Sequence, residues 1–159
     1  MAHHIPVEQF ATELFDLLEE TFENVKGIYL DGGTSLFETL DTITAEMASR
    51  PVSPTCATIA AQIEHVRFYL DTLARYMVGD DPGKVDWGEI WRTVGSVTPE
   101  EWEASKGRLR ASYQRIMKLL KGFDTWQGEQ ELAGALAILV HTAYHLGEIR
   151  QALCTVRPS

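Results

Sequence analysis

The chain has 159 residues, with 14 basic side chains, 23 acidic side chains and a formal net charge of −9. A chain of this length forms one domain with its own hydrophobic core, so we expect a single domain over residues 1–159 with a mobile segment at residues 1–6. The acidic balance argues against nucleic-acid binding, because phosphates attract basic surfaces.

Apolar residues at helical spacing predict a first long helix from about Val7 to Lys26, which Gly27 ends. A shorter helix follows, with Thr34 as its N-cap and its end near Ser49. The sequence RPVSP then breaks the helix, because proline cannot continue it. The first third of the chain therefore predicts one long helix and one short helix.

A second long helix is expected from about Thr58 to Met77, with an apolar stripe along one side and charged residues along another. The connection that follows, from Val78 to Val97, exceeds the roughly 2 to 8 residues of a simple helix hairpin. We therefore expect it to cross the bundle. Between the stripe and the charged side of this helix lies a polar border that suits a pocket wall, formed by Thr58, Gln62, His65, Tyr69, Thr72 and Tyr76.

The third long helix has the clearest start in the sequence, because Thr98, Pro99 and Glu101 combine an N-cap, an N1 proline and a capping-box acid. It extends to about Lys121, and a short turn then allows an antiparallel fourth helix over about residues 129–155. No segment predicts a strand. We therefore expect an all-α fold, a four-helix bundle with an extra short helix between the first and second long helices.

Three histidines form the candidate functional site. His141 and His145 lie four residues apart in the fourth helix and so share one face, and His65 lies on the polar border of the second long helix. Buried imidazoles need hydrogen-bond partners or a metal ion. The competing interpretation is that each ring bonds to a backbone carbonyl. His3 and His4 belong to the expected mobile segment.

The spacing of possible ligands argues against other metal motifs. Di-iron helical bundles need two ExxH motifs on separate helices, and no glutamate of this sequence precedes a histidine by three residues. The sequence also lacks HExxH and any cysteine-rich zinc pattern. A single three-imidazole site with open coordination positions remains. Zn²⁺ and Ni²⁺ suit such ligands best, and Fe²⁺ and Mn²⁺ suit them less well.

Four segments of the chain resemble the DinB-like (YfiT-like) four-helix-bundle metalloproteins. They are GTSLFETLDTITAEMASRP, EHVRFYL, WGEIWRTVGSVTPEEWEASKGRLRASYQRI and HTAYHLGEIRQAL. The resemblance implies an up-down-down-up bundle, with one metal histidine in the second helix and an HxxxH pair in the last. Carried over to this chain, the ligands are His65, His141 and His145.

Members of that family usually end in HxxxHxGQI, whereas HTAYHLGEI here places Glu148 at the position of a common glutamine. Glu148 lies on the same face as His145 and could bind the metal, accept an N–H from a ligand ring, or take a proton from metal-bound water. Its alternative is a solvated carboxylate. Glu64 adjoins His65 but points about 100° away around the helix, so we expect a surface acid.

The resemblance implies a metal-dependent enzyme, because members are described as hydrolases and relatives act as transferases or isomerases with low-molecular-weight thiols. The expected partner is a small-molecule substrate or thiol, although no catalytic residue can be assigned. The alternative is a non-catalytic metal- or ligand-binding module of a stress response. The apolar fourth helix and the resemblance also favour a homodimer.

No apolar stretch is expected to reach the roughly 18 to 20 residues of a membrane span, and MAHHIPVEQF has no apolar signal core. We therefore expect a cytoplasmic protein without a membrane partner. Cys56 and Cys154 lack CxxC spacing and are expected to be free thiols, with a redox pair at one bundle end as the alternative. Trp87 and Trp91 are expected to pack along the crossover.

Overall fold

The computed structural model describes residues 5–128 and 130–157. Within these residues the protein is all-helical, as predicted, with seven helices and no strand. The elements are α1 (Val7–Phe22), α2 (Leu36–Leu40), α3 (Ala45–Ser49), α4 (Ile59–Met77), α5 (Glu89–Thr93), α6 (Pro99–Leu120) and α7 (Glu131–Val156).

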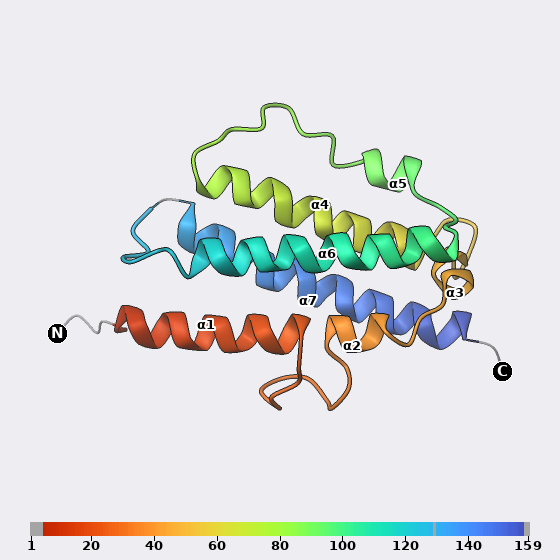
Figure 1. The fold of residues 1–159 in the computed structure, drawn as a ribbon, viewed down its shortest axis with the longest axis horizontal. Coiled ribbons are helices and arrows are strands. Elements are labelled where there is room, and N and C mark those ends of the chain that lie inside the picture. Colours follow the sequence, from red (N-terminus) through yellow and green to blue (C-terminus); the bar gives the residue numbers. More distant parts are fainter. Residues whose placement is uncertain (1–4, 129, 158–159) are drawn as a thin grey trace.

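The four long helices lie side by side (Figure 1). In this view α1 and α7 run from left to right, whereas α4 and α6 run from right to left. Helix α4 packs against both α6 and α7, and α1 packs against α7. The connection that carries α5 returns along the length of α4, so that α6 starts at the same end of the molecule as α4 (Figure 1). Helix α4 therefore has two long helices as neighbours, and the connection that carries α5 covers another of its sides.

The first helix ends earlier than predicted, at Phe22 and not at Lys26. Glu20 accounts for the difference, because its buried carboxylate accepts four backbone N–H groups between Lys26 and Leu30, at distances of 2.7 to 3.1 Å. These donors bend the chain back over the last turn of α1. A side chain inside the helix thus organises the loop that follows it.

The segment expected to form one short helix forms two. Ser35, and not Thr34, is the N-cap of α2, where it makes a capping box with Glu38. Thr44 then caps α3 by accepting the N–H of Met47 at 3.2 Å. A second N-cap inside the segment starts a new helix because its side chain replaces the backbone partner of the first turn.

The starts of α4 and α6 agree with the prediction. Thr58 caps α4 by accepting the N–H of Ala61 at 3.1 Å. At α6, Glu101 N–H donates to Thr98 Oγ1 at 3.2 Å and Thr98 N–H donates to the Glu101 carboxylate at 2.7 Å. Helix α7 starts at Glu131, two residues later than expected. The short helix α5 was not predicted.

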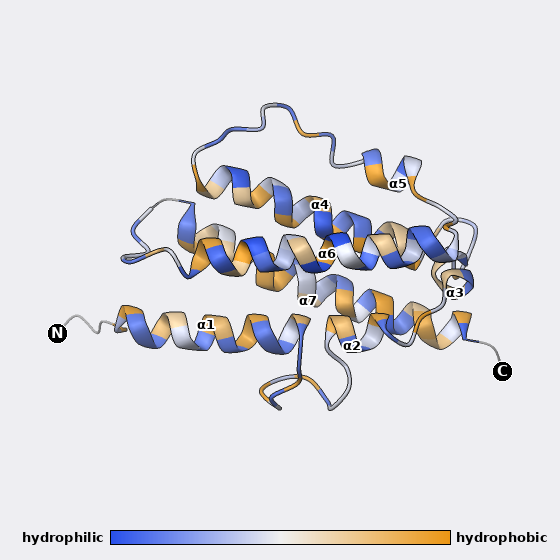
Figure 2. Ribbon diagram, in the orientation of Figure 1, coloured by the Kyte–Doolittle hydropathy of each residue, from blue (hydrophilic) through white to orange (hydrophobic). Residues whose placement is uncertain are grey.

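Apolar side chains from all four long helices form one core. Figure 2 shows orange and blue residues alternating along α1, α4 and α6, the pattern of helices with one buried side. The largest fully buried side chains include Leu18, Phe22, Ile63, Leu70, Trp102, Leu109, Ile116 and Ile138.

Helix α7 is more apolar than the others and exposes part of its apolar surface. Among the described residues it is the one helix long and apolar enough to cross a membrane by length and composition, with 39% of the relevant window buried. The expectation that no stretch reaches this length was therefore wrong. The exposed residues Leu132, Leu136, Val140 and Tyr144 follow one another at intervals of four along α7.

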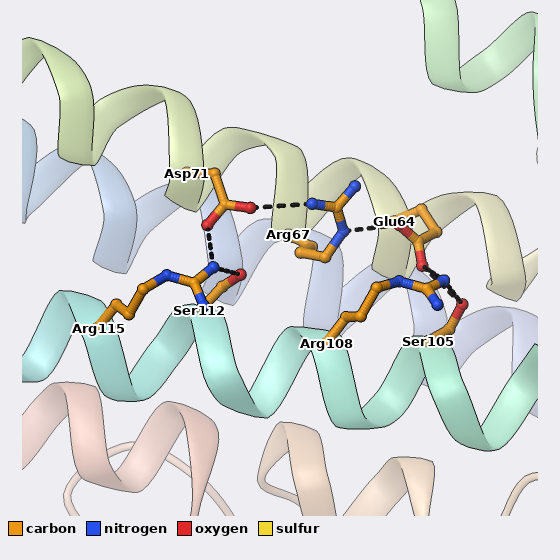
Figure 3. Close-up of polar contacts among 7 residues, drawn as sticks. All are labelled: Glu64, Arg67, Asp71, Ser105, Arg108, Ser112 and Arg115. Atoms are coloured by element: carbon orange, nitrogen blue, oxygen red, sulfur yellow. Dashed lines mark hydrogen bonds and ion pairs between the residues drawn. The ribbon is translucent and has the colours of Figure 1, made fainter. Parts of the chain in front are cut away.

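A ladder of ion pairs joins α4 to α6 (Figure 3). Glu64, expected to be a surface acid, is instead buried, with 7% of its surface exposed. Its carboxylate accepts from Ser105 at 2.6 Å, from Arg108 at 2.6 Å and from Arg67 at 2.7 Å. The prediction failed because two of these partners, Ser105 and Arg108, come from α6, whose position local helical geometry does not give.

The same arrangement recurs seven residues further along both helices. Asp71 accepts from Arg115 at 2.8 Å, and Arg115 also donates to Ser112. Arg67 links the two steps by contacting Asp71 at 2.9 Å (Figure 3). This α4–α6 ladder fixes the register between the helices and the rotation of α4, so that the next residue, His65, faces α7.

Candidate metal centre

The structure brings the three predicted histidines together. His65 comes from α4, and His141 and His145 come from successive turns of α7. One ring nitrogen of each residue lies within 4.8 Å of the others, and the Nε2 atoms of His65 and His141 are 3.1 Å apart. His65 and His145 are buried and His141 is partly buried. Two neighbouring helices thus present a compact set of imidazole donors.

Two oxygen atoms orient the ring of His145. Its Nδ1 lies 2.6 Å from Gln62 Oε1 and 2.9 Å from Glu148 Oε2. Both oxygens accept hydrogen bonds, so Nδ1 carries the proton and the neutral ring has its lone pair on Nε2. A hydrogen bond that fixes the tautomer and the rotation of a ligand histidine is typical of protein metal sites.

His65 and His141 are less completely partnered. Their Nε2 atoms contact each other, so one ring donates and the other accepts. The Nδ1 atoms of both rings are buried and have no hydrogen-bond partner among the described residues. Polar atoms left unpaired in the interior are uncommon. The cluster therefore combines burial with incomplete hydrogen bonding, which is unfavourable for a purely structural group.

This donor set fits a divalent metal ion. Two nitrogens bound to one tetrahedral zinc ion at ordinary bond lengths lie about 3.3 Å apart, close to the 3.1 Å between His65 and His141 Nε2. Side-chain nitrogens are also the donors that Zn²⁺ and Ni²⁺ prefer. Glu148 contacts His145 and is not part of the cluster of possible ligands. Its position corresponds to the second expected role, as acceptor of a ring N–H.

Burial keeps the three rings neutral at pH 7. Desolvation lowers the pKa of His141 to about 3, and the neighbouring His145 and His65 act in the same direction. Desolvation likewise lowers the pKa of His65 to about 4, although the charge of Glu148 partly opposes it. The pKa of His145 is also lowered by burial, against the raising effect of Glu148. Neutral imidazoles are the forms that bind metals.

Aromatic side chains cover the cluster from two directions. Tyr69 of α4 stacks on His141, with ring centroids 3.7 Å apart and an interplanar angle of 7°. Trp91 of α5 lies over His65 at 4.3 Å. Trp87 packs against Tyr69 at 5.6 Å, so both tryptophans of the connection pack against α4, as predicted. The crossover segment therefore forms one wall of the site.

A pocket of about 680 Å³ opens beside the cluster. His145 is the histidine that lines it, together with Val52, Gln62, Trp91, Tyr144 and Glu148. A small molecule in this pocket would therefore contact the ring of His145 and the two side chains that orient it. The volume lies within the range of small-molecule sites, about 300 to 1,000 Å³.

The sequence identified part of this site. Gln62 and Tyr69 of the predicted polar border lie against the histidines, whereas Thr58 caps α4 and donates to the carbonyl of Gly95 at 3.1 Å. Trp91 was expected only to pack, and Tyr144 was not singled out. The available signal for Tyr144 was its i, i+4 spacing from Glu148, which puts both side chains on one face of the helix.

The cysteines do not belong to the cluster of possible metal ligands. Both Cys56 and Cys154 are exposed free thiols, as predicted. Cys56 lines the pocket beside His145, whereas Cys154 lines a different hollow next to Arg150. The structure therefore pairs neither with the other. His3 and His4 lie outside the described residues, as does most of the segment expected to be mobile.

No protein-family model matches the chain, and no curated protein or solved structure matches it.

Proposed function

We propose that this protein is a DinB-like metalloprotein in which His65, His141 and His145 hold one divalent ion, with Zn²⁺ or Ni²⁺ as the favoured metals. The observation that carries the proposal is the convergence of three neutral imidazoles that are buried or partly buried, two of which, His65 and His141, have a ring nitrogen without a partner in the described part of the chain. The helix directions in Figure 1 support an up-down-down-up four-helix bundle. The motifs quoted above support the family.

The pocket supports an enzyme that acts on a small molecule, either a hydrolase or a transferase that uses a low-molecular-weight thiol. A divalent ion with open positions supplies Lewis acidity, which polarises a bound group and stabilises a thiolate or hydroxide. Gln62 and Glu148 hold the ring of His145 in one orientation. Trp91 shields His65 on the side of the crossover. No catalytic residue is assigned.

Elemental analysis of tag-free protein tests the metal site. We expect close to one equivalent of metal in the wild type and loss of that metal in the double variant His65→Ala, His141→Ala. The double variant His3→Ala, His4→Ala is the matched control and should retain the metal. Equal metal content in the wild type and the first variant would contradict the proposal.

A screen of metal-loaded protein tests the catalytic part. One arm combines low-molecular-weight thiols with electrophiles, and the other supplies simple esters and amides. Turnover that depends on the metal and disappears in the His65→Ala, His141→Ala variant supports an enzyme. Metal binding without turnover in either arm would contradict it.

The second candidate is a non-catalytic metal- or ligand-binding module of a stress response. One observation favours it: the histidines come from α4 and α7, so a bound ion would cross-link two helices of the core. Metal sites of this kind contribute directly to folding. If metal removal unfolds the protein and no turnover is found, this candidate replaces the enzyme.

We also propose a cytoplasmic homodimer formed through α7, without a membrane or nucleic-acid partner. The exposed residues Leu132, Leu136 and Val140 support a protein contact on that helix. Val140 is 66% exposed, so Val140→Glu should leave the fold intact and produce monomers. Light scattering that gives a monomer for the wild type, or fractionation of the protein with membranes, would contradict the respective part.

A further inference from the structure

The charge of the pocket beside His145 restricts what it can bind. Among the described residues that line it, Glu148 is the one charged side chain, and no lysine or arginine is present. Arg150, on the same helix, lines a different hollow and contacts Thr39 at 3.4 Å. An anionic ligand would therefore enter beside an uncompensated carboxylate, in a protein of net charge −9. Both features disfavour anions.

Two aromatic rings lie near His145, the residue that Glu148 contacts. The centroid of Tyr144 lies 5.0 Å from that of His145, and the centroid of Trp91 lies 6.1 Å from it. Both rings are accessible, with exposures of 61% for Tyr144 and 40% for Trp91. Tyr144 precedes Glu148 by four residues on α7, so the two side chains share one helix face.

Aromatic faces around a carboxylate attract organic cations. The negative face of an indole or phenol ring binds an ammonium group, and tryptophan is the most favourable partner. The remaining pocket wall includes Val52, Ala57 and Ala152, which suit a hydrocarbon body. The pocket thus combines one carboxylate with apolar wall residues around a volume of about 680 Å³.

We propose that this pocket binds small organic cations, in which an ammonium group carries an aromatic or alkyl body. The ammonium lies between Trp91, Tyr144 and Glu148, and the body extends along the apolar wall. The proposal rests on the proposed function only in placing this ligand beside the reacting centre. Binding itself requires no metal, so the two proposals can fail separately.

Calorimetric titration of the full-length, chelator-treated protein tests the proposal with three probes of one shape: benzyltrimethylammonium, benzyl alcohol and benzoate. We expect the cation to bind about tenfold more tightly than the alcohol, and benzoate to bind more weakly than both. A quaternary ammonium cannot coordinate a metal, so its binding reports on the pocket and not on a bound ion.

Variants identify the groups responsible. Glu148→Gln and Trp91→Leu should each reduce the preference for the cation over the alcohol, and circular dichroism should show intact helices. Glu13→Gln, the same charge change at an exposed position of α1, should leave the preference unchanged. Equal binding of cation and alcohol, or an unchanged preference in Glu148→Gln, would overturn the proposal. Cation binding without metal-dependent turnover would support the cation-binding pocket and contradict only the proposed enzyme activity.

Discussion

Glu64 and His65 are neighbours on α4 and are buried to the same extent, 7% exposed each, yet they differ in how the protein completes their hydrogen bonds. Glu64 accepts bonds from Ser105, Arg67 and Arg108. His65 contacts another histidine through one nitrogen and has no partner for the other. One side chain faces α6 and the other faces α7.

This difference distinguishes buried polar groups that stabilise the fold from those that are available to bind a ligand. A buried carboxylate with several donors stabilises the packing of two helices, because each donor offsets part of its desolvation. Imidazoles whose ring nitrogens lack hydrogen-bond partners keep lone pairs that can bind a metal ion from solution. Substitution of Glu64, which faces α6, should therefore affect the stability of the fold. Substitution of His65, which faces α7, should affect metal binding.

The largest effect on stability is expected from the α6 side. Removal of one partner from a buried ion-pair network typically costs 3 to 5 kcal/mol, and because Arg108 is half-exposed we expect about 3 kcal/mol for Glu64→Ala. Urea unfolding measures it. Glu103→Ala removes the exposed carboxylate of an ion pair with Lys106 and should cost about 0.5 kcal/mol or less. Equal losses in the two variants would contradict the structural role of Glu64.

The next largest effect is metal-dependent stabilisation on the α7 side. A ligand at 100 times its dissociation constant stabilises the native state by about 2.7 kcal/mol, so zinc should raise the free energy of unfolding of the wild type by that amount. His65→Ala should abolish this gain, whereas Glu64→Ala should retain it despite its lower starting stability. Urea unfolding with and without zinc provides the measurement. A gain that persists in His65→Ala would place the metal elsewhere.

A smaller effect is expected at Gln62, which orients His145 without belonging to the cluster of possible ligands. Loss of a hydrogen bond to a ligand histidine weakens metal affinity by about tenfold to a hundredfold. Because Glu148 still accepts from Nδ1, Gln62→Leu should fall near the lower end. Competition with a chelator measures the change. Gln151→Leu, in the same pocket, is the control, and equal affinities in both variants would exclude an orienting role.

The sequence predicted the long helices because their signals are local. Thr58, Thr98 and Glu101 mark helix starts through side chains that contact the backbone within three residues. The error at Thr34 was also local, since Ser35 with Glu38 forms the S-x-x-E signature one position later. Local sequence signals therefore locate most helix starts. Where two adjacent residues can both act as N-cap, the predicted start can be wrong by one residue.

The parts that escaped prediction depend on contacts between distant segments. Glu64 was assigned to the surface because its partners Ser105 and Arg108 lie more than 40 residues away on α6. Trp91 reaches His65 because the crossover folds back over α4, and helical periodicity says nothing about that path. The three histidines were predictable because two share a helix face and the third lies on a polar border. Metal binding itself stays a prediction.

Glu20 is a second buried acid with several hydrogen-bond donors, like Glu64. Its titration should have the smallest effect on stability near neutral pH. Burial raises the pKa of Glu20, but the backbone N–H groups that it accepts outweigh burial and bring the pKa from an ordinary 4.5 to about 2. Its folded-state pKa is thus below the unfolded value. The resulting stability is complete above pH 4.5 and is lost as the pH falls towards 2.

Urea midpoints of the wild type and Glu20→Gln, measured from pH 7 to pH 2.5, test this sign. The difference between the two proteins should be constant down to about pH 4.5 and shrink below it, because the carboxylate is protonated first in the unfolded chain. Glu13→Gln, an exposed acid on the same helix, should follow the wild type throughout. A difference that grows on acidification would mean that the loop donors do not favour the charged form of Glu20. The number of hydrogen bonds to a buried group would then not distinguish Glu20 and Glu64, which stabilise the fold, from the histidines.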